Sequence, residues 1–193
     1  MGRIIGKIVN AIFYIFVLPS SLISRLEYKI FHFQFFFTFF ASWYCFFPGI
    51  FGNIIRRMYY NQVMESCDLS TIFLGSLITK INSKIGRRVH IGAYTTIGLA
   101  NIGENTVIAN YVSLLSGRRQ HNFQEAGKDV LAGEDTFAEL KIGKDCFIGE
   151  KCIIMADIGD NCIIGAGAVV VKDVPSYSVA VGNPAKVIKT RNS

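Results

Sequence analysis

The chain is poor in the residues that metal and disulfide chemistry most often use. It has 193 residues but only five cysteines, and no two of them form a C-x-x-C pair. It has three histidines, and one of them, His32, lies in an apolar segment near the N-terminus. A zinc site built from three histidines is therefore nearly excluded. Cys146, Cys152 and Cys162 are most simply small buried residues, Cys45 and Cys67 are isolated, and this usage fits a reducing compartment.

Acidic residues are scarce in the first part of the chain. Residues 1–57 contain six lysines and arginines against a single acidic residue, Glu27. No charged residue occurs between Lys29 and Arg56, and this stretch holds ten of the 16 phenylalanines. Basic residues embedded among phenylalanines favour anionic lipid headgroups over nucleic acid as the partner. We therefore expect residues 1–66 to form a basic, apolar, membrane-associating helical region.

Two helices are expected in this region. The stretch Ile4–Leu18 is apolar for 15 residues before Pro19, and its polar residues fall on one helical stripe, which suits a helix lying in the membrane interface. The stretch Ile30–Phe47 would span about 27 Å as a helix, slightly less than the hydrocarbon core of a bilayer. We expect two monotopic helices, or a shallow hairpin with both ends on one side. A helix buried in a packing interface and a cleaved signal peptide are the alternatives.

From Ile85 onward, an aliphatic residue recurs every six positions. Glycine usually follows it, as in Ile85-Gly86, Ile91-Gly92 and Ile97-Gly98, and a small or β-branched residue comes four positions after it. A repeat this short cannot be a helix pair or a propeller blade, and it predicts a parallel β-helix in which each repeat is one short strand plus a bend. Glycine at the second place indicates either a positive φ or no room for a Cβ atom.

Three repeats make one turn of a triangular prism. Every irregular step in the repeat then follows the third strand of a coil, so all the irregularities are expected at one corner. The longest step, from Leu114 to Ile142, contains 22 extra residues. We expect a loop over residues 115–141 that leaves from this corner, and a loop of this length in a compact solenoid is usually functional or disordered.

The repeats, together with the runs IGAGAVVVKDVP at Ile164–Pro175 and GNPAK at Gly182–Lys186, resemble the hexapeptide-repeat acyltransferases. The resemblance covers roughly Ile72–Arg191, and the two runs are specific for the branch of CoA-dependent O- and N-acetyltransferases. The basic N-terminus and the segment SGRRQH at Ser116–His121 are similar to acetyltransferases of cell-envelope saccharide biosynthesis. The resemblance implies a mainly β chain, with a left-handed parallel β-helix acyltransferase domain over residues 67–193, and a homotrimer.

In that family a histidine on the extruded loop is the general base, and His121 is the only histidine in that position here. A neutral imidazole near pH 7 can take the proton of a hydroxyl as the new C–O bond forms. Backbone N–H groups at strand bends can stabilise the thioester oxyanion, so no covalent enzyme intermediate is needed. The alternative for His121 is a solvent-exposed loop histidine. The partner that orients its ring is left open among Glu125, Asp129, Glu134, Asp135 and Glu139.

The resemblance also implies acetyl-CoA as co-substrate and no metal. Amides around Gly149, Ala166 and Ala168 would bind the pantetheine arm. The cations that would meet the nucleotide phosphates are Lys172, Lys186, Lys189 and Arg191, with an ordinary charged terminus as the alternative. The candidates for binding the acceptor are Asn110, Arg118 and Arg119, and the two arginines would equally suit a lipid headgroup.

Together these features predict an acetyl-CoA-dependent O-acetyltransferase, peripheral or monotopic on the cytoplasmic face of the plasma membrane. Its acceptor would be a saccharide hydroxyl, lipid-linked or part of a cell-envelope glycan, and its partners would be membrane lipid and two further copies of the chain, with no nucleic acid. The alternatives are an N-acetyltransferase, an acyl-carrier-protein-dependent sugar acyltransferase, and a non-catalytic trimeric scaffold at the membrane.

Overall fold

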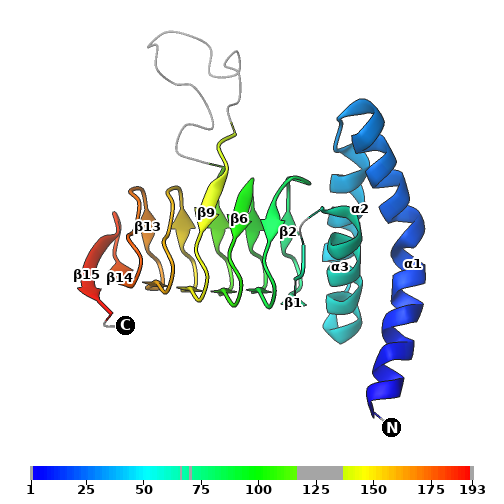
Figure 1. Ribbon diagram of the computed structural model, residues 1–193, viewed down its shortest axis with the longest axis horizontal. Coiled ribbons are helices and arrows are strands. Elements are labelled where there is room, and N and C mark those ends of the chain that lie inside the picture. The colour runs from blue at the N-terminus through cyan, green and yellow to red at the C-terminus, as the bar shows by residue number, and fades with distance from the viewer. Residues whose placement is uncertain (1, 66, 70, 117–136, 192–193) are drawn as a thin grey trace.

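A computed structural model describes residues 2–65, 67–69, 71–116 and 137–191 of the chain. Three helices come first: α1 (Gly2–Phe31), α2 (Phe35–Cys45) and α3 (Gly49–Val63). They form the helical platform, which covers one end of a β-structured prism: α2 and α3 lie next to the prism, and α1 packs on them as the outermost helix (Figure 1). The C-terminal strands lie at the opposite end of the prism.

The prism has three faces, each a sheet. The seven-stranded sheet runs in the order β1-β4-β7-β10-β12-β14-β15, the five-stranded sheet in the order β13-β11-β8-β5-β2, and the three-stranded sheet in the order β3-β6-β9. Every pair is parallel except β14 with β15. The strands are β1 (Thr71–Ile72), β2 (Leu77–Ile78), β3 (Lys84–Ile85), β4 (His90–Ile91), β5 (Thr96–Ile97), β6 (Ala100–Ile102), β7 (Val107–Ile108), β8 (Ser113–Leu114), β9 (Leu140–Ile142), β10 (Phe147–Ile148), β11 (Ile153–Ile154), β12 (Ile163–Ile164), β13 (Val169–Val170), β14 (Ser178–Val181) and β15 (Lys186–Thr190).

The six-residue repeat is confirmed as the unit of this prism. Successive strands along the chain occupy successive faces, so residues one coil apart are paired: Ile85 with Ile102, and Ile102 with Ile142. The aliphatic residue of each repeat points inward and is buried, and these residues form three stacked columns that fill the core. The fold is the predicted mainly β, left-handed parallel β-helix with N-terminal helices.

The repeat glycines are required by space and not by backbone conformation. A Cβ atom on Gly143 would lie 2.5 Å from the backbone nitrogen of Asp160 in the next coil, and the same holds for Gly149 against Ala166. The positive φ angles fall two residues later in the repeat, on residues such as Tyr94 (54°) and Lys151 (59°). The glycine therefore lets adjacent coils approach closely, while the next bend places a non-glycine residue in the left-handed region.

The second inward column, four residues after the aliphatic one, is partly polar, and its side chains form hydrogen bonds to backbone carbonyls within the prism. Thr95 Oγ1 donates to the carbonyl of Ala109 over 2.9 Å, and Thr106 Oγ1 donates to Gly143 over 2.9 Å. In the coils nearer the C-terminus, cysteines occupy this column and contact carbonyls in the same way: Cys146 Sγ lies 3.1 Å from the carbonyl oxygen of Gly159. Burial raises the pKa of Cys146 to about 11, so this thiol is protonated at neutral pH and acts as a small core residue.

The helices differ from the expected ones in their limits. α1 continues through Pro19, where a helix end was predicted, and the stretch expected as one helix over Ile30–Phe47 is divided between α1 and α2. Tertiary contacts hold α1 together beyond the proline, because Ser20 bonds Tyr44 and Ser24 bonds Tyr59, each over 2.9 Å. These contacts outweigh the local cost of a proline inside a helix.

The break between α1 and α2 has local causes. His32 adopts a φ of 57°, which ends α1. The carboxylate of Glu27 then accepts a hydrogen bond of 2.8 Å from the backbone N–H of Phe36, which satisfies a free donor in the first turn of α2. Gln34 lies in the break, and its Oε1 accepts a bond of 2.9 Å from the N–H of Ile81 in the first coil of the prism. The turn is thereby attached to the prism.

One buried arginine joins the platform to the prism. Arg56 of α3 is 1% exposed, and its guanidinium donates to the carbonyls of Ile72 (3.0 Å) and Phe47 (2.7 Å), with longer bonds to Tyr44 and Cys45. Beside it, the hydroxyl of Tyr60 accepts a bond of 3.0 Å from the N–H of Ile78. Desolvation lowers the pKa of Arg56, yet its carbonyl partners hold the charged form in place. The first β-bridge of the prism joins Cys67 to Ile85, and the division of the chain at residue 66 stays a prediction.

The platform exposes many apolar side chains. A stretch of α1, Val9–Phe31, is long and apolar enough to cross a membrane by length and composition alone. We call the exposed apolar side chains of the helices the outer face of the platform; they include Ile15, Phe16, Leu26, Ile30, Phe31, Phe35, Phe39, Trp43, Phe46, Ile50 and Phe51.

Candidate functional site

The long interruption of the repeat leaves from a single corner of the prism. The chain departs after β8 at Ser116 and returns at Phe137 before β9, between the five-stranded and the three-stranded sheet. We call this segment the excursion. Several predicted site residues lie within it and therefore outside the described residues: His121, Arg118, Arg119, Glu125, Asp129, Glu134 and Asp135. Their proposed roles stay predictions.

The two ends of the excursion are fastened to each other and to the coil below. The carbonyl of Ser116 accepts a bond of 3.2 Å from the N–H of Ala138, and Ser116 Oγ accepts one of 2.8 Å from the N–H of Leu99. Leu140 N–H donates to the carbonyl of Leu99 over 2.9 Å. Ser116 is buried, and its hydrogen bonds hold the start of the excursion on the coil below. The sequence indicates Ser116 only as part of the SGRRQH motif and does not predict these bonds. The base of the excursion is thus a fixed structure.

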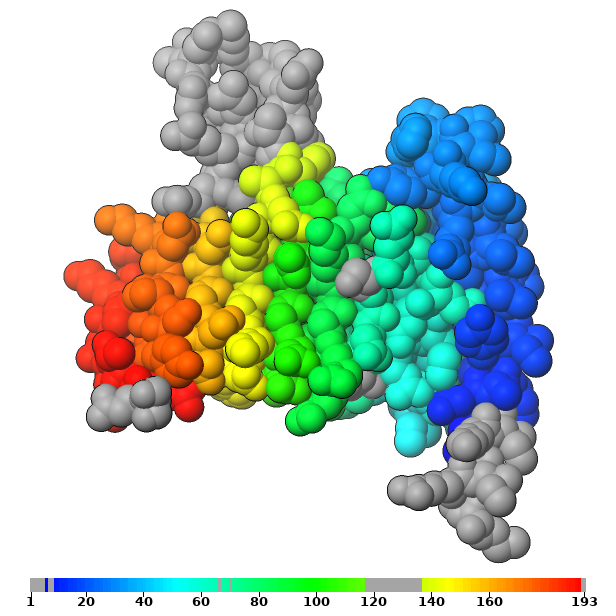
Figure 2. Space-filling model, in the orientation of Figure 1, coloured from blue at the N-terminus to red at the C-terminus, as the bar shows by residue number. Residues whose placement is uncertain are grey.

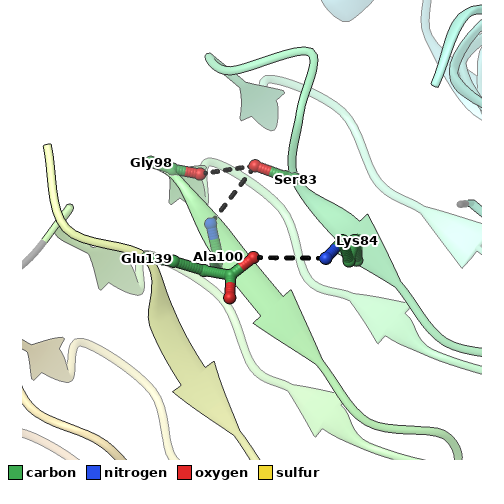
Figure 3. Close-up of polar contacts among 5 residues, drawn as sticks. All are labelled: Ser83, Lys84, Gly98, Ala100 and Glu139. Atoms are coloured by element: carbon green, nitrogen blue, oxygen red, sulfur yellow. Dashed lines mark hydrogen bonds and ion pairs between the residues drawn. The ribbon is translucent and has the colours of Figure 1, made fainter. Parts of the chain in front are cut away.

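A polar cluster lies at the same corner (Figure 3). Ser83 Oγ donates to the carbonyl of Gly98 over 3.0 Å and accepts from the N–H of Ala100 over 3.2 Å. Lys84 Nζ lies 3.9 Å from Glu139 Oε1. Glu139, one of the five acidic residues considered as partners for His121, is therefore placed beside the base of the excursion with a lysine as its neighbour. This cluster borders a cavity of about 330 Å³, the corner cavity, lined by Glu65, Ile81, Asn82, Ser83, Lys84, Leu99 and Glu139.

Asn110 lies at a different corner. It is exposed between the seven-stranded and the five-stranded sheet, and its Oδ1 accepts a bond of 2.8 Å from the N–H of Ala93 in the coil below. The rings of Tyr94 and Tyr111 stack at the same corner with their centroids 5.2 Å apart. Within one chain, Asn110 therefore lies at a different corner from the described ends of the excursion, Ser116 and Phe137.

The residues expected to bind the co-substrate lie in the C-terminal half of the prism, away from the helices. The N–H of Gly149 donates to Ile164 over 2.8 Å, and the N–H of Ala168 donates to Gly165 over 3.2 Å. These two donors are used within the prism, whereas Ala166 is exposed, and the assignment of amides around the three residues to the pantetheine arm stays a prediction. Among the expected cations, Lys172, Lys186 and Lys189 are exposed, and Arg191 donates to the carbonyl of Asn161 over 2.9 Å.

Four of the cysteines in the described residues have thiols whose pKa is raised, so none of these four is an activated thiolate. Burial raises the pKa of Cys45 and Cys152, and it raises that of Cys67 to about 12. Within the described ranges, no three His, Cys, Asp or Glu side chains form a group that could hold a metal ion. The histidine of the prism, His90, is exposed on β4 and bonds the hydroxyl of Thr71.

Comparison with known proteins supports the repeat and the fold. The family described as the hexapeptide repeat of succinyl-transferase matches residues 139–172. A maltose O-acetyltransferase from Clostridium difficile 630 is similar in structure, with a TM-score of 0.66 and 24% identity over 81% of this chain and 89% of that chain. A search of curated proteins finds no match.

Two further solved structures have the same fold. One is an N-acyltransferase from Bacillus cereus, in complex with dTDP-4-amino-4,6-dideoxyglucose and coenzyme A, with a TM-score of 0.53 and 18% identity over 66% of this chain and 73% of that chain. The other is a hexapeptide-repeat-containing acetyltransferase from Vibrio cholerae, with a TM-score of 0.53 and 15% identity over 72% of this chain and 80% of that chain. These neighbours are acyltransferases by name, and at these identities the likeness establishes the fold.

Proposed function

We propose that this protein is an acetyl-CoA-dependent O-acetyltransferase that acts on a saccharide hydroxyl, with His121 as the general base. One observation carries the proposal: a regular hexapeptide prism is interrupted by one long segment, and that segment holds His121. The names of the similar structures support a sugar-related acyl transfer, since one is a maltose O-acetyltransferase and another is an N-acyltransferase bound to an amino sugar and coenzyme A.

The proposed reaction is a direct transfer. The neutral imidazole of His121 takes the proton of the acceptor hydroxyl while the oxygen attacks the thioester carbonyl. The C–S bond then breaks, and the imidazolium returns the proton to the departing thiolate of coenzyme A. The raised pKa values of the buried cysteines give no support to an acyl-cysteine intermediate. Much of the acceleration would come from holding both substrates in one orientation.

The co-substrate would lie along the C-terminal half of the prism. The exposed amide of Ala166 is the best placed of the three predicted amides to bind the pantetheine arm, because the other two N–H groups are bonded within the prism. The exposed cations Lys172 and Lys186, with Arg191, would meet the phosphates.

A homotrimer is part of the proposal, and the surface of the prism supports it. Apolar side chains point outward from the seven-stranded and five-stranded sheets, among them Val107, Phe147 and Ile153, which are each 38–46% exposed. The three-stranded sheet instead points Lys84, Asn101 and Lys141 outward. Copies packed through the two apolar faces would cover these side chains. The corner that carries Asn110 lies between those two faces. In a trimer, the excursion of a neighbouring copy would therefore lie near Asn110.

The outer face of the platform supports attachment to the cytoplasmic face of the plasma membrane. Its exposed phenylalanine, isoleucine and leucine side chains lie on a region with a net positive charge, which suits the headgroup boundary of an anionic membrane. The expected result in a flotation assay is that the protein rises with anionic phospholipid vesicles. Replacing Phe35, Phe39 and Trp43 with serine should leave it at the bottom of the gradient, with an unchanged circular dichroism spectrum.

The function is tested by release of coenzyme A from acetyl-CoA by the detergent-purified protein, with and without an extract of membrane glycolipids. We expect extract-stimulated release that falls by at least about 100-fold in His121→Ala. The matched control is His90→Ala, which removes an exposed histidine of the prism and should retain activity. Equal losses in both variants, or release that survives in His121→Ala, would rule out the general base.

The product and the donor separate the alternatives. An O-acetyl ester is cleaved by alkaline hydroxylamine, whereas an N-acetyl amide survives it, so treatment of the labelled product distinguishes the two transfers. Activity with acyl-carrier protein but not with acetyl-CoA would identify the carrier-dependent enzyme. Absence of any acetyl-CoA binding would favour the trimeric scaffold.

A further inference from the structure

A second cavity opens where the end of α1 meets the first coil of the prism. Its volume is about 420 Å³, and we call it the edge cavity. Its lining combines the last two turns of α1 with the entry to the prism, and consists of Arg25, Tyr28, Lys29, His32, Val63, Glu65, Ile81 and Asn82. Neither the motifs in the sequence nor the proposed transfer reaction uses these residues.

The cavity is rich in cationic donors. Arg25 and Lys29 are exposed, and neither forms an ion pair with any residue of the described ranges. The carboxylate nearest to them along the chain, Glu27, is bonded to the N–H of Phe36. A lysine in the last turn of a helix is favourable because of the helix dipole, but Arg25 lies more than a turn earlier, so the dipole does not account for it. One carboxylate, Glu65, also lines the cavity.

The walls of the cavity are joined to each other. Asn82 Nδ2 of the prism donates to the hydroxyl of Tyr28 of α1 over 2.6 Å. Gln34, just past the end of α1, accepts the N–H of Ile81 over 2.9 Å. The cations are therefore carried by a helix end that is bonded to the prism on two sides, which is the kind of preorganisation that a binding site needs.

The edge cavity is continuous in its lining with the corner cavity. The two share Glu65, Ile81 and Asn82, and the corner cavity continues to Glu139 at the base of the excursion. In Figures 1 and 2, the turn between α1 and α2 and the start of β9 project on the same side of the molecule, and the surface dips between them. A path thus leads from the edge of the platform to the base of the segment that carries His121.

The length of this path suits a short saccharide. β2 lies in the first coil and β8, which precedes the excursion, lies two strand positions away in the same sheet. At a strand spacing of about 4.8 Å, the excursion leaves ~10 Å above the first coil. Along this path Glu65, Asn82 and Glu139 supply acceptors and a donor for sugar hydroxyls.

We propose that the edge cavity binds a phosphate group that is esterified to the acceptor saccharide, and that the sugar lies along the corner cavity toward the excursion. This inference rests on the proposed function and names the class of acceptor: a phosphate-linked or diphosphate-linked saccharide. Arg25 and Lys29 are the donors for the phosphate oxygens. Because exposed apolar residues such as Ile30 and Phe33 lie next to these cations in the chain, a lipid carrier is the favoured source of the phosphate, and a nucleotide carrier is the other.

The test measures binding of three probes to the full-length protein in a neutral detergent, by calorimetry. Farnesyl diphosphate carries a lipid and a diphosphate, farnesol carries the lipid alone, and UDP carries the diphosphate on a nucleoside. The double variant Arg25→Gln/Lys29→Gln should bind farnesyl diphosphate at least about tenfold more weakly than the parent and should bind farnesol equally well. The matched control, Arg87→Gln/Lys151→Gln, removes the same net charge from the exposed surface of the prism and should bind farnesyl diphosphate as the parent does.

The outcomes separate the phosphate site from the transferase. Farnesyl diphosphate that binds no tighter than farnesol, or equal weakening in the two double variants, would overturn the phosphate site. UDP binding that falls together with farnesyl diphosphate binding supports the site and assigns it to a nucleotide carrier, whereas absent UDP binding assigns it to a lipid carrier. Binding of acetyl-CoA is measured in the same samples. Absence of this binding in the parent protein contradicts the proposed function. Retention of this binding in the double variant shows that the variant is folded.

Discussion

The platform and the prism use apolar residues in opposite ways. In the prism, the aliphatic residue of each repeat is buried, and most of the outward positions are polar or half-covered. In the platform, tyrosines and serines that share hydrogen bonds lie in the interior beside a few apolar residues such as Phe37 and Ile55, while many other phenylalanines and isoleucines are exposed. The high apolar content of the chain is therefore not explained by a large core. It reflects a second surface of exposed apolar side chains, of the kind that contacts a membrane or another protein.

The two regions also differ in how their stability is distributed. Each coil of the prism contacts only its neighbours, and the same contacts recur in every coil, as is typical of solenoids. The junction of the platform with the prism depends on a few large side chains, with Arg56 at the centre. Substitutions should consequently have graded effects in the prism and concentrated effects at the junction.

The largest effect is expected at Arg56. Arg56→Met leaves the carbonyls of Ile72 and Phe47 without their donor in a buried position, and should lower the free energy of unfolding by about 3–5 kcal/mol. Urea denaturation followed by far-ultraviolet circular dichroism measures it. The control is Arg57→Met on the half-exposed side of the same helix, which loses one bond to Asn10 and should change stability by less than about 1 kcal/mol. Similar losses in the two variants would mean that the junction is not concentrated in Arg56.

The next effect compares two neighbouring residues of one strand in the prism. Ile154 is fully buried and Ile153 is 39% exposed, so the same substitution probes the inside and the outside of β11. Ile154→Ala should cost about 2–4 kcal/mol, because it opens a cavity between adjacent coils. Ile153→Ala should cost less than about 1 kcal/mol in the monomer. A larger loss for Ile153→Ala in a preparation that sediments as a trimer would place that residue in the subunit interface.

Glycine substitutions should have opposite signs in the two regions. Gly143→Ala places a methyl group 2.5 Å from the nitrogen of Asp160 and should cost about 1–3 kcal/mol. Gly6 lies in α1 with open space around its Cβ position, so Gly6→Ala should stabilise the protein by up to about 1 kcal/mol. Thermal unfolding of both variants beside the parent protein gives the comparison. A neutral result for Gly143→Ala would contradict the close approach of the coils.

The smallest effect is a pH dependence within the prism. The Cys146 thiol has a pKa raised to about 11 by burial, whereas in the unfolded chain it ionises near its usual value of 9.0. The folded state therefore holds this proton more tightly, and the resulting stability is present below pH 9 and is lost as the pH rises toward 11. Between pH 8 and pH 10 the parent should lose about 1 kcal/mol more than Cys146→Ala, measured as the shift in urea midpoint at the two pH values. Equal losses in parent and variant would place the thiol in a solvated site.

The prism could be predicted from the sequence because its rule is local. A single inward position every six residues sets the column, the face and the coil, so the stacking of Ile85 on Ile102 follows from counting. The corner from which the excursion leaves follows from the same count. What counting could not supply is the role of the glycine, which depends on the coil above it.

The platform was harder to predict because its limits are decided by distant contacts. α1 passes through Pro19 since Ser20 and Ser24 are held by tyrosines of other helices, and no local pattern near the proline indicates this. The edge cavity was missed for a similar reason. Its cations are ordinary residues of a helix in the sequence, and they line one cavity only because Asn82 and Ile81, more than fifty residues later, complete its walls.

The fastened base of the excursion has a consequence for how such a protein can change. Ser116 and Ala138 are bonded directly, and the strands on either side, β8 and β9, stack in register with the coils before them. The stacking of the coils therefore does not depend on the sequence inserted between β8 and β9. The inserted segment could therefore be exchanged, by recombination or by grafting, and the same stack of coils would carry a new chemistry with no substitution in its core.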